Sequence, residues 1–235
     1  MIVPAPSPSS GSPEPVPAEA ALLSACLLSS SGGFLDAFTY VGHGQVFANS
    51  MTGNVVLLGS FLALGEPARA LRHVPPLAAF FVGVFLARAL RHYARRAAVA
   101  GLGLEIGVLA AACFLPRGFP DLVLVLAIAF VAALQNSGFN RLEGWSYNSV
   151  ITTANLRRCA ETLFEGVAAH RNPFALREAR VFGTVCSCFL AGAFAGAFLT
   201  PRWGNLALAV PVFLLAVVLA RLFAGLKLPM AGRGG

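Results

Sequence analysis

The chain has 235 residues, of which 57% are hydrophobic and 11% are charged. Soluble domains carry about 25% charged residues, so this composition excludes an ordinary soluble protein and indicates a polytopic membrane protein. The net charge of +7 would suggest nucleic-acid binding in a soluble protein. Here the basic residues lie at the ends of apolar segments, where they set membrane orientation, and no nucleic-acid partner is expected.

The two ends of the chain differ in composition from its centre. Residues 1–18 contain six prolines and four serines, which predicts a disordered tail. Residues 226–235 are expected to form a flexible C-terminal tail. Between the tails we expect a single transmembrane domain over residues 19–225, made of repeat halves at about 19–118 and 119–225.

Six apolar segments follow one another within this domain, and each is close to the length that a helix needs to cross the hydrocarbon core. Helices are the expected form, because a helix satisfies all of its own backbone polar groups in lipid. The predicted spans are residues 20–41, 74–90, 98–115, 122–138, 181–200 and 206–220.

Two further segments, residues 43–65 and 140–169, begin polar and then become helical. The helix in the first is too short to cross a bilayer alone, and the charged residues in the second exclude a lipid-facing span. Within them, residues 47–54 (FANSMTGN) align with residues 147–155 (YNSVITTAN) with one residue of slack. We interpret both segments as short broken or re-entrant helices and as the marks of an internal repeat.

The distribution of Arg and Lys supports this arrangement. If both short segments return to the side from which they entered, most Arg and Lys residues fall on one side of the membrane, whereas the imbalance becomes small if both cross. The positive-inside rule therefore favours six spans in the inner (plasma) membrane, with both termini in the cytoplasm. Three spans per half is an odd number, so the halves must have opposite orientations. The expected fold is an all-α polytopic membrane protein with six transmembrane helices, two short broken or re-entrant helices and an inverted 3+3 repeat.

Asp36 is the strongest single signal for function. It is the only formal charge between residues 20 and 65 and lies close to Gly32 and Gly33. A carboxylate in the middle of a span costs about 2.5–3.5 kcal/mol on insertion scales. Two interpretations stay open: a ligand for an ion, proton or substrate, or an Asp that caps the end of a span at the water interface.

Polar residues at the starts of the two short helices are further candidates. Asn and Thr side chains cap helix N-termini, whose free N–H groups and dipole favour an anion or a polar ligand. The alternative is simple capping of a solvated turn. The candidates are Asn49, Thr52 and Asn54 in the first segment and their counterparts Thr153 and Asn155 in the second.

Gln135 and Asn136 lie near the end of the charge-free segment at residues 122–138. Their amides could bind a solute without the cost of burying a charge, or could join neighbouring spans by hydrogen bonds. Glu105 is expected to snorkel at the start of its span, the alternative being a second intramembrane acid.

Motifs for catalysis and for cofactor or metal binding are not found in the sequence, which has no clustered Ser/His/Asp set, HExxH motif or Walker loop. We expect no enzyme activity, no cofactor and no metal. Arg157 and Arg158 are interpreted as a cytoplasmic anchor that pairs with Glu161 on one helix face, the alternative being that they attract an anionic substrate. The cysteines have no CxxC or CxxH spacing and are interpreted as reduced packing residues: Cys26, Cys113, Cys159, Cys186 and Cys188.

These patterns predict a small-solute or ion secondary transporter or permease, with Asp36 as a proton- or cation-linked ligand and the polar residues above lining a central site. The expected partners are the lipid bilayer, a small solute or ion of unknown identity and, by analogy with other small permeases, a second copy in a homodimer. The alternative is a non-transporting membrane scaffold or assembly factor. In that case Gly192 and Gly196 would form a subunit interface.

The chain resembles the YoaK family of bacterial membrane proteins over roughly residues 20–225. The family has no established activity, and the resemblance implies a multi-span inner-membrane protein without supplying a mechanism. In the second half the family commonly has Thr-Gly before Asn-Leu, whereas Ala154 stands here in place of the Gly. The matching pieces are Gly33-Phe34-Leu35-Asp36-Ala37, Phe47 through Thr52-Gly53-Asn54, Gln135-Asn136, and Thr152-Thr153 with Asn155-Leu156-Arg157.

Overall fold

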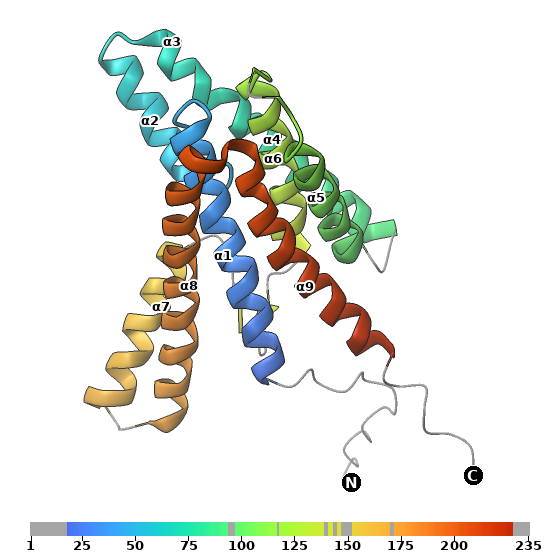
Figure 1. Cartoon of the computed structure of the whole chain (residues 1–235). Coiled ribbons are helices and arrows are strands. Elements are labelled where there is room, and N and C mark those ends of the chain that lie inside the picture. Colours follow the sequence, from blue (N-terminus) through green and yellow to red (C-terminus); the bar gives the residue numbers. More distant parts are fainter. Residues whose placement is uncertain are drawn as a thin grey trace, which may run out of the picture.

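The computed structural model describes the central part of the chain as a set of helices (Figure 1). The two predicted tails fall outside it almost entirely, as do residues 147–151 of the predicted repeat motif. The described residues are 18–93, 97–116, 118–138, 141–142, 145–146, 152–169 and 172–227.

The predicted all-helical architecture is confirmed in its main feature, and the departure is a short hairpin in which Arg141 pairs with Ser146. The described elements are α1 (Ala18–Gly42), α2 (Met51–Ala63), α3 (Pro67–Ala70), the 3-10 turn η1 (Leu71–His73), α4 (Val74–Tyr93), α5 (Ala97–Ala112), α6 (Asp121–Gly138), β1 (Arg141–Leu142), β2 (Trp145–Ser146), α7 (Thr152–Phe164), the π turn η2 (Glu165–Ala169), α8 (Pro173–Trp203), the 3-10 turn η3 (Gly204–Leu208) and α9 (Ala209–Lys227).

One helix starts well before its predicted apolar segment. The expected span at residues 181–200 lies inside α8, which begins at Pro173. Asn172 caps this helix, because its side chain accepts a hydrogen bond of 3.0 Å from the Phe174 N–H, and proline is favoured in the first helical turn. The first turns of α8, before residue 181, carry charged residues, so a search for apolar segments does not include them.

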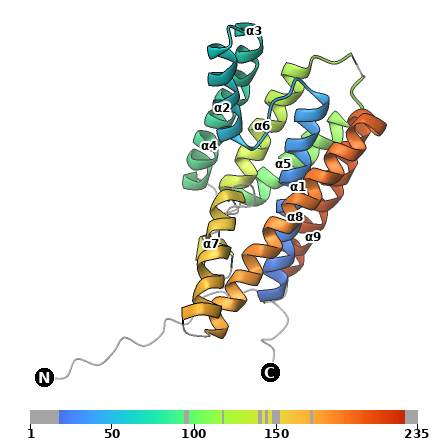
Figure 2. The same cartoon turned by 90° about the vertical axis from the view of Figure 1, so that its left-hand side faces the viewer.

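The helices run between two ends of the molecule (Figures 1 and 2). We name these the α3 end, where α3 lies, and the α7 end, where α7 and α8 are joined. Helices α1, α5 and α8 run toward the α3 end, and α4, α6 and α9 run away from it. The short α2 starts near the middle and runs to the α3 end, whereas the short α7 starts near the middle and runs to the α7 end.

Glycines allow two pairs of helices to approach closely. A Cβ atom on Gly192 of α8 would lie 1.9 Å from the Ser30 carbonyl oxygen of α1, and one on Gly196 would lie 2.5 Å from the carbonyl oxygen of Phe34. Gly83 of α4 meets the Phe130 carbonyl oxygen of α6 in a similar way, at 2.7 Å. The interpretation of Gly192 and Gly196 as a subunit interface is therefore wrong, because both pack α8 on α1 within the chain.

The main apolar core lies between α1, α5, α6 and α9. Phe34 and Phe38 of α1 pack there with Leu102 and Leu109 of α5 and with Leu215 of α9, and all five side chains are buried. α1 thus contacts α8 through small residues on one side and the apolar core on another.

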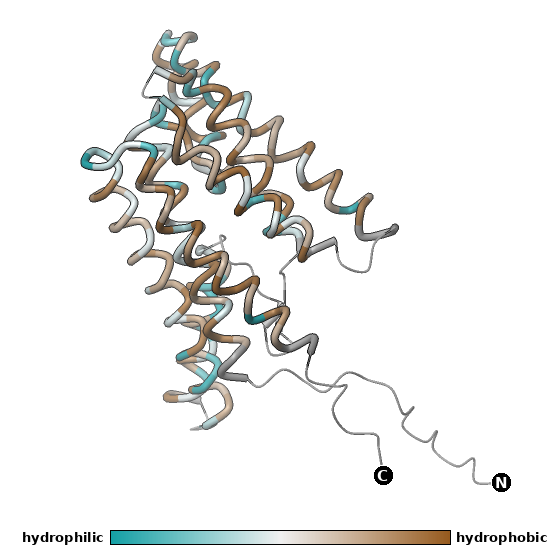
Figure 3. The backbone as a smooth tube through the Cα atoms, turned by 45° about the vertical axis from the view of Figure 1, so that its right-hand side comes forward, coloured by the Kyte–Doolittle hydropathy of each residue, from teal (hydrophilic) through white to brown (hydrophobic). Residues whose placement is uncertain are grey.

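The outside of the helices is apolar as well. Three stretches of the described residues are long and apolar enough to cross a membrane, namely Ala21–Gly42, Pro67–Leu90 and Pro173–Ala224, and α2, α5 and α6 contain shorter apolar stretches. Figure 3 shows hydrophobic residues along most of the long helices, whereas the short α7 is mixed. Large side chains such as Phe81, Phe85 and Phe194 are exposed, which suits lipid rather than water. The chain is a helical membrane protein.

Candidate functional site

Asp36 holds the turn that connects α1 to α2. Its side chain is only 4% exposed. One carboxylate oxygen accepts hydrogen bonds from the Asn49 N–H at 2.6 Å and the Ser50 N–H at 3.3 Å. The Ser50 hydroxyl donates to the other carboxylate oxygen. Within the turn, Gly44 and Gln45 have backbone φ angles of 85° and 61°. Positive φ angles are uncommon for residues other than glycine, such as Gln45.

These contacts tie Asp36 of α1 to the two residues directly before α2, whereas an N-cap side chain binds free N–H groups within the first helical turn. The Ser50 hydroxyl, at the N-cap position of α2, makes no cap bond to the helix, and it binds the carboxylate of α1 instead. The negative charge lies at the start of α2, where the helix dipole favours it. Asp36 is buried and binds the turn before a neighbouring helix, so it does not cap the end of its own span at the water interface. Its role as a ligand stays a prediction.

Asn54 closes the same turn from inside α2. The Phe47 N–H donates to the Asn54 side-chain oxygen at 2.9 Å, and the Asn54 amide donates to the Phe47 carbonyl oxygen at 2.7 Å. His73 Nδ1 lies 3.2 Å from the same side-chain oxygen and is also buried. The sequence analysis missed His73, and the only available signal was a histidine directly before an apolar helix.

Several buried polar atoms have no hydrogen-bond partner among the described residues. The Asn49 amide donates to the Gly32 carbonyl oxygen at 3.4 Å, while its own side-chain oxygen is unpartnered. On α6, Gln135 Nε2 and the Asn136 side-chain oxygen also have no hydrogen-bond partner among the described residues. Buried polar groups are nearly always paired in proteins, so unpartnered atoms on three predicted site residues need an explanation.

Glu105 lies inside the helix bundle rather than at the edge of the membrane. Its side chain is 1% exposed, and its Oε2 atom has no partner in the described part of the chain. One helical turn earlier, Gly101 faces α6, where a Cβ atom on this glycine would lie 3.6 Å from the Leu134 Cβ. The expected snorkelling position is therefore wrong, because Glu105 is buried between helices.

The structure separates the remaining predicted site residues. Thr52 and Thr153, each the second residue of its short helix, are exposed, whereas Asn54 and Asn155, each the fourth, are buried. Asp36, Asn49 and Asn54 meet at one turn, Gln135 and Asn136 lie on α6, and Asn155 lies on α7. That these groups share one ligand stays a prediction.

The charged residues of α7 form two different ion pairs. Arg157 pairs with Glu161 at 2.7 Å, as predicted. Arg158 was expected to pair with Glu161 too, but it reaches Glu178 of α8 at 2.5 Å. The reason is that Glu178 is 5% exposed on its side chain and a buried carboxylate needs a close counter-ion.

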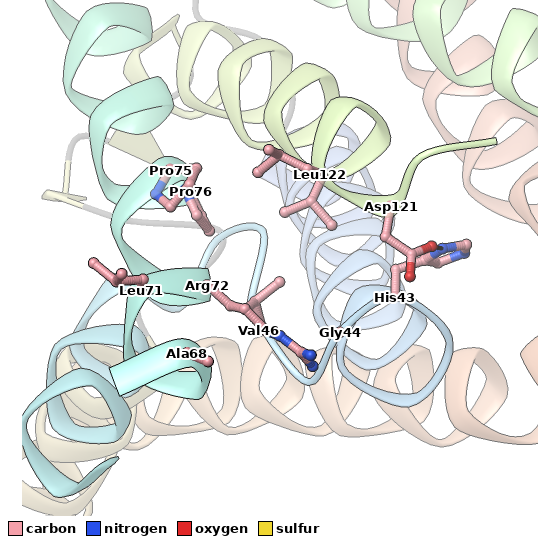
Figure 4. A pocket seen from close by; sticks show the side chains of 11 residues that line it. His43, Gly44, Val46, Ala68, Leu71, Arg72, Pro75, Pro76, Asp121 and Leu122 are labelled. Carbon is pink, nitrogen blue, oxygen red and sulfur yellow. Dashed lines mark hydrogen bonds and ion pairs between the residues drawn. The ribbon is translucent and has the colours of Figure 1, made fainter. Parts of the chain in front are cut away.

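A cavity of about 460 Å³ opens at the α3 end (Figure 4). On one side His43 Nδ1 lies 2.7 Å from Asp121 Oδ1, a hydrogen bond that joins the end of α1 to the start of α6. The residues His43, Gly44 and Val46 that line it belong to the turn held by Asp36. The cavity and the Asp36 carboxylate therefore both contact the turn between α1 and α2.

A family model described as protein of unknown function, DUF1275, matches residues 24–221. The chain belongs to this family. The predicted resemblance to the YoaK family, which is of the DUF1275 type, is thereby confirmed. The matched region begins in α1 and ends in α9, so the DUF1275 match includes both short helices and every candidate site residue. Comparisons with curated proteins and with solved structures gave no match.

Proposed function

We propose that this DUF1275 protein is a small secondary transporter or permease that moves a small polar solute or ion through a polar site in the helix bundle. The observation that carries the proposal is the set of buried, unpartnered atoms on Asn49, Gln135 and Asn136. A buried polar atom without a partner costs about 1–3 kcal/mol. Within a membrane, a bound solute, ion or water is the natural partner for such atoms.

The chemistry of these atoms narrows the class of solute. Together with Glu105 Oε2, which is buried and unpartnered as well, the set has three oxygens, on Asn49, Asn136 and Glu105, and the amide nitrogen of Gln135. Oxygen acceptors suit a cation or the hydroxyl and amine groups of a polar solute. Gln135 Nε2 is a donor, and the Ser31 hydroxyl, which is buried and unpartnered too, can also donate, so both suit an acceptor on the solute.

Asp36 is proposed to couple the site to protons or cations. Its ionised carboxylate accepts three hydrogen bonds from Asn49 and Ser50. Protonation or a competing cation would weaken these bonds and free the turn before α2. The same carboxylate could therefore bind the coupling ion and control the position of Asn49.

An inverted repeat is proposed as the frame of this site. In such a repeat α1, α4 and α5 of the first half correspond to α6, α8 and α9 of the second half. α1 packs on α8 and α9, and its counterpart α6 packs on α4 and α5, so the first helix of each half contacts the last two helices of the other half. The short helices α2 and α7 each have 13 residues and run in opposite directions. Ser30 and Phe130, whose carbonyl groups meet Gly192 and Gly83, stand one repeat length apart. These features support two halves that insert with opposite orientations.

Six spans and an inner-membrane orientation are proposed with it. The start of α1 and the end of α9 lie at the α7 end (Figure 1). Basic residues gather in the helix portions at that end, including Arg88, Arg177, Arg180 and Arg221, while the α3 end carries Arg69, Arg72 and Arg202. By the positive-inside rule the α7 end, with both termini, faces the cytoplasm.

Water accessibility tests the proposal. In a cysteine-free background, Asn49→Cys and Asn136→Cys should react with a small aqueous thiol reagent at least about ten times faster than Val131→Cys. Val131 is the matched control, since it is buried on α6 and apolar. In reconstituted vesicles, Asp36→Asn should remove the pH dependence of solute uptake.

Equal, slow labelling at all three positions would contradict a solute pathway. That result would favour the alternative of a scaffold or assembly factor, in which Asn49 and Asn136 only hold helices together. A homodimer remains a proposal under either function, to be checked by the mass of the protein in detergent.

A further inference from the structure

The cavity at the α3 end has the size of a ligand site. Its volume of about 460 Å³ lies within the range of roughly 300–1,000 Å³ that is usual for small-molecule pockets. Its walls come from both halves of the chain, with the α1–α2 turn, α3, η1 and the start of α4 on one side and the start of α6 on the other. Most of the lining is apolar, including Val46, Leu71, Pro75, Pro76 and Leu122.

The two charged side chains that line this cavity, Asp121 and Arg72, differ in their contacts. Asp121 is paired with His43 at 2.7 Å, which leaves the Arg72 guanidinium with no ion-pair or hydrogen-bond partner among the residues that the structure describes. Figure 4 shows the Arg72 side chain extending toward Val46 and Gly44, on the side of the cavity opposite Leu122. The neighbouring Arg69 differs, because it binds Glu66 at 2.6 Å and lies over the ring of Phe61.

We propose that this cavity binds an organic anion that has one carboxylate or phosphate group on an apolar body, with Arg72 as its counter-ion. A guanidinium group matches the two oxygens of such an anion with paired hydrogen bonds. The apolar walls accept the body of the ligand and exclude a small, fully hydrated ion. A cation is disfavoured, because the carboxylate of Asp121 already has His43 as its partner.

The inference stands apart from the transport proposal, since it concerns equilibrium binding at the α3 end. The two are linked through the backbone of the α1–α2 turn. His43, Gly44 and Val46 line the cavity, and Asn49 and Ser50 bind Asp36. A ligand in the cavity would hold one end of the turn while Asp36 holds the other.

Equilibrium dialysis with radiolabelled phenylacetate tests the proposal on the full chain in phosphatidylcholine nanodiscs. We expect saturable binding that Arg72→Gln weakens at least about tenfold, the loss expected for a hydrogen bond to a charged group. The matched control Arg69→Gln should bind like the wild type. The neutral analogue phenylacetamide should compete at least about tenfold less well than unlabelled phenylacetate.

A second pair of variants tests the place of binding. Leu122→Trp fills the cavity and should abolish binding, whereas Val123→Trp, on the next, exposed position outside the lining, should not. Both residues are about half exposed (51% and 49%), so neither change is expected to unfold the chain. Equal binding by Leu122→Trp and the wild type would overturn the proposal, as would unchanged binding by Arg72→Gln or no saturable binding.

The source of the anion is decided by lipid composition. Phosphatidylglycerol in the nanodisc supplies a phosphate on an apolar body, and competition by this lipid would support a headgroup ligand. Unchanged phenylacetate binding in the same nanodiscs would support a soluble carboxylate. Either result keeps the chemistry assigned to Arg72.

Discussion

At the scale of single residues, the hydrogen bonds between Asp36 and the turn before α2 explain how a carboxylate is stable when it is buried among apolar helices. The donors of these bonds are Asn49 and Ser50, the two residues directly before α2. Hydrogen bonds to a charged group contribute about 1.5–3 kcal/mol each, which is comparable to the insertion cost of the charge. The carboxylate thus keeps the turn in a conformation that includes the left-handed Gln45.

Replacing Asp36 by Asn should loosen this turn. The amide carries no charge, and its nitrogen cannot accept the hydrogen bond of Ser50. We expect backbone amide hydrogen exchange in residues 47–54 to become about 10- to 100-fold faster, equivalent to the loss of one charged hydrogen bond. Ser50→Ala should give a smaller increase, since the bond from the Asn49 N–H remains. Unchanged exchange in Asp36→Asn would show that the turn is held by other contacts.

Single residues also mark the limit of prediction from sequence. Asp36 and Asn54 stand out because a polar residue in an apolar segment needs a partner, but their partners depend on the path of the turn through Gly44 and Gln45. Arg158 could not be assigned to Glu178, because the pairing requires α7 to lie along α8. A local pattern can predict only i,i+4 pairs such as Arg157 with Glu161.

At the scale of elements, close backbone contact is what joins α1 to α8. Ser29 donates to the Val185 carbonyl oxygen at 3.1 Å and Ser30 donates to that of Cys188 at 3.0 Å. Together with Gly192 and Gly33, these small residues bring the two backbones together. Small residues and hydroxyl groups are typical of helix contacts in membranes, where apolar burial alone gives little preference for one partner.

Gly192→Ala should therefore destabilise the fold. The added methyl group would meet the Ser30 carbonyl oxygen at 1.9 Å, and backbone shifts forced by overpacking cost about 1–3 kcal/mol. A thermal unfolding scan in detergent should show a clearly lower midpoint. Gly103→Ala is the control, because a Cβ on Gly103 of α5 meets nothing within 4 Å. An equal midpoint for both variants would contradict the close contact.

The presence of each helix was predicted better than the residues at which it starts and ends. The apolar segments and both short helices are helical, since hydrophobicity and length suffice to recognise them. The start of α8 depends on the Asn172 cap, and the pairing of β1 with β2 depends on a turn that no hydrophobic pattern marks. Polar signals of this local kind determine boundaries rather than the number of helices.

At the scale of the whole molecule, the two ends differ in charge and in the elements that form them. Ala68 lies on α3 and is exposed, and Phe174 lies at the start of α8, at the α7 end, and is exposed. The proposed inverted repeat requires these ends to face opposite sides of the membrane. The partners of each helix were not predictable from sequence, because hydrophobicity reports burial but does not identify the neighbour.

Labelling in intact cells should separate the two ends. In a cysteine-free background, Ala68→Cys should react with a membrane-impermeant maleimide from outside the cell. Phe174→Cys should react only after the cells are permeabilised. Glu165→Cys, on the exposed η2 turn at the same end as Phe174, should behave like Phe174→Cys. Reaction of positions 68 and 174 from one side would contradict the inverted arrangement.

The contact between α1 and α8 has a consequence for biosynthesis. The hydrogen bond from Ser29 to Val185 spans 156 residues of sequence, so the ribosome must add most of the protein before the first helix meets its main neighbour. Until then the glycine and serine side of α1 is left without its partner beside the insertion machinery. Nascent chains that stop before α8 should therefore be substrates for membrane quality control, even though most of their hydrophobic helices are already made.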